Sequence, residues 1–460
     1  MNLTASSMNR MAFTTREPIG IVSAISAFNH PFNLIVHQVV PAVAVGCPVI
    51  VKPASTTPLS CLNLVDCLYE AGLPKKWAQV IICKGALAER MATDPRVSFL
   101  TFIGSGEVGW GLRSKLAEGT RCALEHGGAA PVIVEPDADI EDALPLLAKG
   151  GFYHAGQVCV SVQRIFVHED IVENFSKKLV GIAKKLVVGD PTDEKTEVGP
   201  LIQKGEAERI HKWVEEAKAA GGKILTGGNK IGDTCYEPTV ILNPPYDSNV
   251  SQCEIFGPVI NIYSYKNRDD AIKLANDVPF SFQAAIFTKD INAALESAKD
   301  LNAAAVMVND HTAFRVDWMP FAGRKSSGLG VGGILPTMIE MTEEKLIVFR
   351  SKSGGAHVFL FTKEWVTAAA MIEKLRSIAK ELGLPKNVEI FPKQDRVRED
   401  GFGSFLNMPY VNAEHTQRYA YDDKGNAVDA SDLKALYDKK ALTSDEFTDL
   451  KVKKLSLIHI

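Results

Sequence analysis

The sequence predicts an α/β fold, in which mainly parallel sheets are covered by helices on both faces. The first observation is a repeating order of short apolar runs, each followed by a segment with helical spacing. This alternation is typical of doubly wound parallel sheets. The second is a glycine-rich turn at 104–109, placed between an apolar run and a predicted helix. The third is a length of 460 residues with 46% hydrophobic content, which suffices for about two or three globular domains.

The first part of the chain contains the alternation most clearly. Thr57 and Pro58 predict the start of a helix, because Pro is favoured in a first turn and leucine and valine then recur at helical spacing. The predicted strands of this part are 19–28, 48–52, 78–83 and 97–103.

The same order continues to residue 350 and predicts a second α/β part. Its predicted helices are 140–152, 171–186, 204–220, 269–275 and 291–301. Its predicted strands are 164–168, 223–226, 238–242, 258–265, 284–288, 304–309 and 345–350.

Composition and charge exclude several classes of protein. The formal net charge of −4 gives no electrostatic argument for a nucleic-acid or membrane partner. No apolar run is long enough to cross a bilayer. The eight cysteines form no C-x-x-C pair or disulfide-like pattern, so we expect a reducing, cytoplasmic location and no metal site.

Cys159 is the candidate nucleophile. It follows Ala155, Gly156 and Gln157, which predicts a thiol on a tight glycine turn at the start of a helix. A helix N-terminus or a nearby cation lowers the pKa of a thiol and favours the reactive thiolate. The alternative is a buried structural cysteine, which is common.

The turn at 104–109 has the glycine spacing of a dinucleotide fingerprint. Gly104, Gly106 and Gly109 follow a predicted strand and precede a helix, where backbone can approach a pyrophosphate. Such fingerprints are often followed, about 20 residues on, by an acid that binds the ribose. Glu125 lies near that distance and could take this role.

Six separated motifs over about residues 16–350 resemble the aldehyde dehydrogenase superfamily. They are Phe28-Asn29-His30-Pro31-Phe32, Lys52-Pro53-Ala54-Ser55-Thr56-Thr57-Pro58, Glu125-His126-Gly127-Gly128, Gly156-Gln157-Val158-Cys159, Glu254-Ile255-Phe256-Gly257-Pro258 and Pro320-Phe321-Ala322-Gly323. The resemblance implies a dinucleotide-binding domain at 1–134, a catalytic domain at 135–344, an oligomerisation-type strand at 345–350 and a homo-oligomer.

The resemblance also implies the catalytic residues. Cys159 would attack an aldehyde carbonyl as a thiolate, and the side chain of Asn29 with the Cys159 backbone N–H would stabilise the oxyanion. Glu125 would activate the water that hydrolyses the thioester, which releases it from a ribose role. The alternatives are a turn-forming Asn29 and a surface-paired Glu125.

The cofactor implied by the resemblance is NAD or NADP. Lys52 matches a lysine that contacts the adenine ribose, and Glu254 with Phe256 matches the pair at the nicotinamide ribose. Gly104 and Ser105 match the turn near the pyrophosphate, which continues through Val108 and Gly109. Many members that prefer NAD carry Glu at the position of Ser55, so we expect NADP to be tolerated or preferred.

The predicted substrate is a small anionic or hydroxylated aldehyde, of the lactaldehyde, semialdehyde or phosphonoacetaldehyde type. Arg315 and His311 fall in a loop that lines the substrate mouth in the family. A guanidinium there suits an anionic group. The alternative is a surface ion pair between Arg315 and Asp317.

Two features depart from the family. Members have a sizeable segment ahead of the position that matches residue 16, so we expect an incomplete cofactor domain with exposed apolar surface. Residues 351–460 have no cysteine and include predicted strand 358–361 and helix 368–382. Over about 351–425 they resemble an α+β fragment of the archaeo-eukaryotic primase superfamily.

The primase resemblance would place Ser353 and His357 at a nucleotide phosphate, and nucleic acid would bind only through this fragment. The metal-binding Asp pair of that family has no counterpart here, so we expect no polymerase activity. A fused or misassembled reading frame, an inactive chain and a scaffold remain alternatives to an active enzyme.

Overall fold

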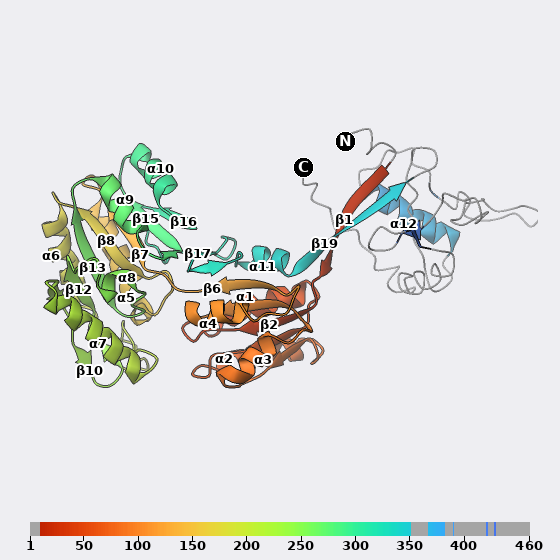
Figure 1. Cartoon of the computed structure of the whole chain (residues 1–460), viewed down its shortest axis with the longest axis horizontal. Coiled ribbons are helices and arrows are strands. Elements are labelled where there is room, and N and C mark those ends of the chain that lie inside the picture. Colours follow the sequence, from red (N-terminus) through yellow and green to blue (C-terminus); the bar gives the residue numbers. More distant parts are fainter. Residues whose placement is uncertain (1–9, 351–366, 382–389, 391–419, 422–426, 429–460) are drawn as a thin grey trace, which may run out of the picture. The chain divides into compact units, whose positions relative to one another are not determined.

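The computed structural model describes residues 10–350, 367–381, 390, 420–421 and 427–428 (Figure 1). The chain divides into two compact units. One consists of Glu17–Glu343, and the other of Met1–Arg16 together with Glu344–Ile460. None of the helices within the described ranges is long and apolar enough to span a membrane.

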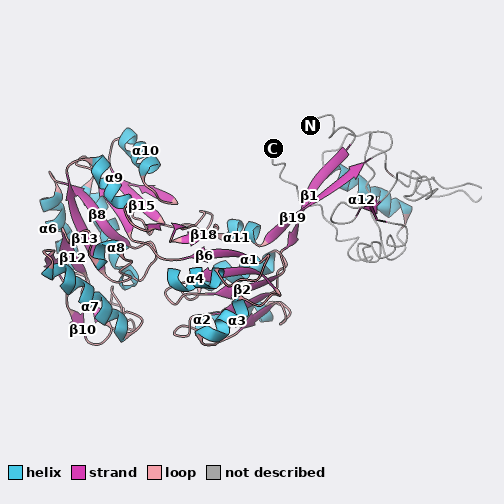
Figure 2. Ribbon diagram, viewed as in Figure 1, coloured by secondary structure: helices cyan, strands magenta, loops and turns pink. Residues whose placement is uncertain are grey.

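The unit Glu17–Glu343 begins with a six-stranded sheet in the order β18-β6-β5-β2-β3-β4. All neighbouring strands are parallel except β18 and β6, which are antiparallel. The strands are β2 (Ile21–Ile25), β3 (Val49–Lys52), β4 (Ala78–Val80), β5 (Val97–Ile103), β6 (Arg121–Glu125) and β18 (Gly328–Leu329). The helices packed with them are α1 (Asn33–Ala44), α2 (Leu59–Glu70), α3 (Gly85–Ala92), α4 (Gly106–Arg113) and α11 (Ile334–Glu340) (Figure 2).

The same unit contains a seven-stranded sheet in the order β16-β15-β7-β8-β13-β12-β9, in which only the β9–β12 pair is antiparallel. Its strands are β7 (Ala130–Val134), β8 (Val162–His168), β9 (Lys223–Thr226), β12 (Thr239–Leu242), β13 (Val259–Tyr265), β15 (Gln283–Phe287) and β16 (Ala305–Val308). Its helices are α5 (Ile140–Phe152), α6 (Val172–Ala183), α7 (Lys204–Ala219), α8 (Asn249–Gln252), α9 (Arg268–Asn276) and α10 (Ile291–Asp300). Two small antiparallel pairs are β10 (Lys230–Ile231) with β11 (Cys235–Tyr236), and β14 (Phe280–Ser281) with β17 (Arg324–Lys325).

The predicted mainly parallel α/β arrangement is confirmed by these pairings, and strand 97–103 and helix 140–152 have the predicted bounds. The sequence analysis missed α1, in which valines and Pro41 give weak intrinsic helix propensity. Ile35, Val39 and Ala42 are buried at helical spacing, so packing on the sheet stabilises α1 despite that propensity.

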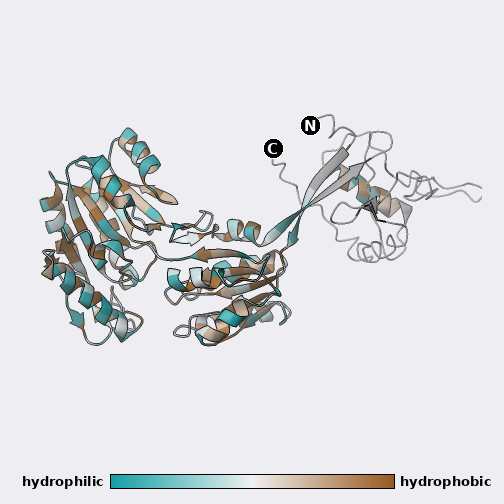
Figure 3. Ribbon diagram, in the orientation of Figure 1, coloured by the Kyte–Doolittle hydropathy of each residue, from teal (hydrophilic) through white to brown (hydrophobic). Residues whose placement is uncertain are grey.

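The chain changes sheets earlier than predicted. We expected the cofactor domain to extend to residue 134, but β7 pairs with β8 and β15 of the seven-stranded sheet. The changeover therefore lies between Glu125 and Ala130, and the chain returns to the first sheet at β18. Figure 3 shows the strands of both sheets largely in brown, the colour of hydrophobic residues. These strands form the apolar interior around which the helices pack.

In the other unit, β1 (Arg10–Pro18) pairs with β19 (Thr342–Arg350), and Arg16 forms an ion pair with Glu344 at 2.6 Å. Helix α12 (Ala368–Glu381) agrees with the predicted helix 368–382. A short pair, β20 (Ala420–Tyr421) with β21 (Ala427–Val428), follows. The predicted strand 358–361 and the residues Ser353 and His357 lie outside the described residues.

Candidate active site

A cavity of about 1340 Å³ in the unit Glu17–Glu343 is lined by strand residues of the first sheet, such as Lys52 and Glu125, and by residues that lie outside the strands of the seven-stranded sheet, such as Cys159 and Glu254. Most of the predicted site residues line it, namely Asn29, Lys52, Ser55, Gly104, Ser105, Val108, Glu125, Cys159, Glu254, Phe256 and Arg315. Gly109 and His311 do not. The groups expected at the cofactor and those expected at the aldehyde therefore share one cavity.

The turn that carries Cys159 differs from the prediction. Helix α5 ends at Phe152, a 3-10 turn covers Tyr153–Gly156, and Cys159 then lies in a turn ahead of β8. The expected helix start at Cys159 is therefore wrong. His154 and Ala155 have φ of 50° and 52°, a left-handed conformation that non-glycine residues rarely adopt and that clusters at functional sites. A side chain on Gly156 would lie 2.0 Å from the carbonyl oxygen of Gly257, so only glycine fits there.

The environment of Cys159 keeps its thiol protonated. Burial raises the pKa of Cys159 well above its ordinary value, the carboxylates of Glu125 and Glu254 raise it further, and Arg315 opposes them. The cysteine is nevertheless half-buried against the cavity, unlike the fully buried Cys47 and Cys61. Its placement favours the nucleophile over the structural cysteine.

Glu125 ends β6 and lines the same cavity. Burial raises the pKa of its carboxyl group to about 7, and the guanidinium of Arg315 opposes this rise. No ion pair within the described ranges includes Glu125, so the surface-paired alternative is not observed there. A carboxyl group that titrates near neutral pH can act as a base or an acid.

Asn29 lies just beyond β2 and contacts the cysteine turn. Its Nδ2 donates a hydrogen bond of 2.9 Å to the carbonyl of Gln157, which leaves one amide hydrogen for another acceptor. Gln157 in turn donates to the carbonyl of Pro200 and accepts from the N–H of Ile202. The sequence analysis did not assign Gln157 this role of fixing the cysteine turn.

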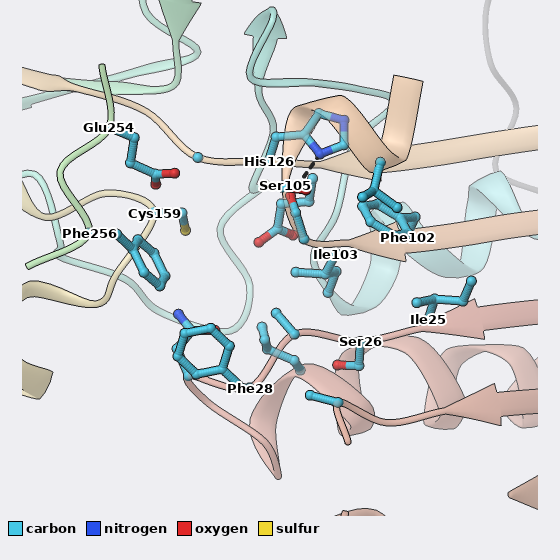
Figure 4. Close-up of a pocket in the computed structure, with 18 of the residues that line it drawn as sticks. Ile25, Ser26, Phe28, Phe102, Ile103, Ser105, His126, Cys159, Glu254 and Phe256 are labelled. Carbon is cyan, nitrogen blue, oxygen red and sulfur yellow. Dashed lines mark hydrogen bonds between the residues drawn. The ribbon is translucent and has the colours of Figure 1, made fainter. Parts of the chain in front are cut away.

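Glu254 and Phe256 lie on the cysteine side of the cavity (Figure 4). The N–H of Gly128 donates to Glu254 at 3.2 Å, and a side chain on Gly127 would lie 1.9 Å from the carboxylate. Burial raises the pKa of Glu254 to about 8. Phe256 has a φ of 50° and contacts Phe28 edge to face, with ring centroids 5.8 Å apart.

The glycine-rich turn lies at the other side of the cavity. Gly104 and Ser105 line it, and Ser105 precedes the first residue of α4. Gly109 instead faces His126, because a side chain on Gly109 would lie 2.0 Å from Cε1 of that imidazole. The Nδ1 of His126 donates to the carbonyl of Gly104 at 2.9 Å, which supports the turn from behind (Figure 4).

Arg315 lies at the cavity beside Glu125 and Cys159. Its guanidinium is 4.1 Å from the centroid of the Phe321 ring, and its buried Nε has no hydrogen-bond partner. The alternative, an Arg315–Asp317 ion pair, is not among the ion pairs of the described residues, although Asp317 is close enough to raise the pKa of Arg315. Arg315 therefore places a cation at the cavity, and the protein does not use its Nε donor.

His311 corrects a prediction, because it does not line the cavity. Its imidazole is buried, its Nδ1 accepts from the N–H of Ala313 at 3.1 Å, and its Cβ packs against Gly150. Thr312 is the residue that joins this loop to the cysteine turn, since its hydroxyl donates to the carbonyl of Val160 at 2.6 Å. The side-chain direction depends on this packing and could not be predicted from the sequence.

Sequence reasoning also missed His30 and Tyr153, which line the cavity near Cys159. The rings of His30 and His154 have centroids 4.3 Å apart, and burial lowers the pKa of His30 to about 4. The sequence signal that could have found them is their place beside predicted site residues: His30 directly follows Asn29, and Tyr153 lies three residues ahead of Gly156. In the described part of the chain, no three His, Cys, Asp or Glu side chains are placed to hold a metal ion.

Comparison with known proteins agrees with this site. The chain matches the aldehyde dehydrogenase family over residues 2–347, beginning ahead of the expected residue 16. It is 44% identical to the 3-sulfolactaldehyde dehydrogenase of Priestia aryabhattai over 343 residues, which are 74% of this chain and 72% of that protein.

Two solved structures are similar over nearly the same part of the chain. Aldehyde dehydrogenase 21 from Physcomitrella patens, in complex with the reaction product succinate, has a TM-score of 0.74 and 39% identity and covers 76% of this chain and 73% of its own. Glyceraldehyde-3-phosphate dehydrogenase GapN from Methanocaldococcus jannaschii, complexed with NADP, has a TM-score of 0.72 and 39% identity and covers 75% of each chain. The chain therefore belongs to the aldehyde dehydrogenase family.

Proposed function

We propose that this protein oxidises an aldehyde to a carboxylate with NAD or NADP, through a thiohemiacetal and a thioester on Cys159. The observation that supports it most directly is that Cys159, Glu125 and Asn29 line one cavity together with Glu254. A nucleophile, a base and an amide donor in one enclosed space are the groups that this chemistry requires.

The first step is attack of the Cys159 sulfur on the aldehyde carbon. Because the thiol has a raised pKa, its proton has to be removed during or before attack, and Glu125 is the carboxylate with a pKa near neutral. The negative charge that develops on the aldehyde oxygen is stabilised by the free amide hydrogen of Asn29 and the backbone N–H of Cys159. After the thioester has formed, Glu125 has to release the thiol proton to solvent, and its carboxylate can then remove a proton from the water that hydrolyses the thioester.

The residues that face the cavity fit a dinucleotide. The volume of the cavity exceeds that of ordinary small-molecule pockets. Because Gly127 has no side chain, the carboxylate of Glu254 can occupy the space beside it. Lys52 and Ser55 would hold the adenosine part and Gly104 and Ser105 the pyrophosphate. Glu254 and Phe256 would hold the nicotinamide ribose. The bound cofactor supplies the hydride acceptor.

Ser55 makes NADP an accepted or preferred cofactor. Ser55 is exposed at the cavity just beyond β3, so its hydroxyl leaves space for a 2′-phosphate. A carboxylate at this position would repel that phosphate. The NADP complex of the similar GapN structure supports this proposal.

The substrate is a small anionic or hydroxylated aldehyde, of the lactaldehyde, semialdehyde or phosphonoacetaldehyde type. Arg315 supports this proposal, because its guanidinium lies at the cavity beside Cys159 and Glu125 and its Nε has no hydrogen-bond partner. The names of the three relatives point to sulfonate, carboxylate and phosphate groups.

A homo-oligomer and a cytoplasmic location complete the proposal. The resemblance of residues 351–425 to a primase fragment stays a prediction, because most of that segment lies outside the described residues.

The test is aldehyde-dependent reduction of NADP by the purified full chain. Cys159→Ser should lower kcat by at least about 10³-fold, because a serine at this site has no adjacent base strong enough to ionise it. The same thermal unfolding curve in both proteins controls for folding. Equal activity of the variant, or no activity of the wild type with any anionic or neutral aldehyde, contradicts the proposal and favours an inactive scaffold.

A further inference from the structure

We propose that Gln163 is a positioning residue that fixes Glu254 relative to Cys159, and thereby sets where the nicotinamide end of the cofactor binds. The inference rests on the proposed function of Glu254. Gln163 lies on β8, just beyond the cysteine turn, and its side chain is buried with 4% of the residue exposed.

The Gln163 amide forms hydrogen bonds to both sides of Glu254. Its Nε2 donates to the carbonyls of Cys253 at 2.7 Å and Val250 at 3.1 Å. Its Oε1 accepts from the N–H of Ile255 at 3.0 Å. The side chain is therefore bonded to the residue before Glu254 and to the residue after it.

The segment held in this way has no regular structure of its own. Residues 253–258 connect α8 with β13 outside any helix or strand, so their backbone groups need partners from elsewhere. Phe256, with its φ of 50°, is in a left-handed conformation that has to be stabilised by its surroundings. Gln163 supplies two of these backbone partners from a rigid strand.

Two further contacts complete the support of Glu254. Arg209 donates to the carbonyl of Ile255 at 2.7 Å, and the N–H of Gly128 donates to the Glu254 carboxylate at 3.2 Å. Gly128 also lies against the cysteine turn, since a side chain on it would lie 3.3 Å from the carbonyl oxygen of Cys159. Gln163 is joined to that turn through the chain itself, because only two residues separate Cys159 from the start of β8. A shift of its amide would change the distance between the carboxylate and the thiol.

The experiment compares Gln163→Met with the wild-type full chain. Methionine has a similar length but leaves the three backbone groups without their partner. We expect the Kd for NADPH, measured by its fluorescence, to rise about tenfold or more, which corresponds to ~1.4 kcal/mol. The near-UV circular dichroism spectrum should stay that of the wild type, which a general loss of structure would not allow.

Asn261 provides a matched control. It is fully buried and also donates to the carbonyl of Val250, at 2.7 Å, but it bonds neither Cys253 nor Ile255. Asn261→Ala should leave the Kd for NADPH within about twofold of wild type. An equal weakening by Asn261→Ala and Gln163→Met, or an unchanged Kd in Gln163→Met, overturns the proposal.

A double-mutant cycle separates this inference from the proposed function. Glu254→Ala should itself weaken NADPH binding, and adding Gln163→Met should weaken it by less than about twofold more, because both changes act on one contact. If Glu254→Ala leaves the Kd unchanged, the proposed role of Glu254 fails. If the two effects multiply in full, Gln163 does not act through Glu254.

A conservative variant covers the case in which Gln163→Met does not fold. Gln163→Glu keeps an acceptor for the N–H of Ile255, and when protonated it keeps one donor. It should bind NADPH more weakly than wild type. Wild-type affinity in a folded Gln163→Glu protein, at a pH where the new carboxyl group is ionised, contradicts the proposal.

Discussion

Replacing Glu125 with glutamine should make the protein more stable at neutral pH and nearly inactive. The carboxyl group titrates at about 7 in the folded protein, against 4.5 as its ordinary value, because burial disfavours its charged form. The unfolded chain therefore loses this proton at lower pH than the folded protein does. The free energy of unfolding therefore falls as the pH rises from 4.5 to about 7. Above pH 7 this contribution of Glu125 no longer changes.

The size of the effect follows from the two pKa values. At ~1.36 kcal/mol per pH unit, the interval between 4.5 and about 7 gives a ceiling of ~3 kcal/mol for the cost of ionising Glu125 in the folded protein. This is a sizeable part of the ~5–15 kcal/mol that stabilises a typical domain. Glutamine has the shape of the protonated carboxyl group and avoids this cost at every pH.

The assay is the free energy of unfolding in denaturant at pH 4.5 and at pH 8. Glu125→Gln should be close to wild type at pH 4.5 and more stable by ~1–3 kcal/mol at pH 8, while its kcat falls by about 10²–10⁴-fold. Glu107→Gln on the exposed face of α4 is the control and should change stability by less than ~0.5 kcal/mol. A Glu125→Gln protein that is less stable than wild type at pH 8, or equally altered at both pH values, refutes the reasoning.

Three other predictions concern the two ends of the cavity. Ser55→Glu should lower kcat/KM for NADP by about 10–100-fold with little change for NAD, since two negative charges would meet at the 2′-phosphate; a wild type that favours NAD by more than about a hundredfold would already contradict the role given to Ser55. Arg315→Ala should lower kcat/KM for an anionic aldehyde at least about tenfold more than for a neutral one of similar size, and equal losses for both would remove the anion site. Gly127→Ala should raise KM for the cofactor by about tenfold or more, because the added methyl group would lie 1.9 Å from the Glu254 carboxylate. An unchanged KM, measured beside Gly205→Ala as an exposed control, would mean that this carboxylate does not contact the cofactor.

The sequence predicted the sheet and helix order well where periodicity was strong. Strand 97–103 is buried on both faces, and its unbroken apolar run predicted that. The sequence failed where tertiary contacts override local preference. Helix α1 contains Pro41 and several valines, so only its packing against the sheet reveals it.

The candidate site was predicted as a set of residues but not as a geometry. The motifs placed Cys159 next to a glycine turn, yet His154 and Ala155 are left-handed and Gly156 lies against the carbonyl of Gly257, about a hundred residues further on. The direction of His311 depends on its packing against Gly150. The sequence around Gln163 does not indicate a positioning role. A glutamine in a strand can be assigned that role only when its hydrogen-bond partners are known.

The short strand β18 has a consequence for biosynthesis. Gly328 pairs with Glu125 at the edge of the first sheet, although about two hundred residues of chain separate them. At ~5–20 residues per second, the ribosome needs about 10–40 s to extend from one to the other. During that time the nascent protein has its thiol and its carboxylate but an open sheet edge beside Glu125, so we expect catalytic competence to appear only after residue 329 has left the exit tunnel.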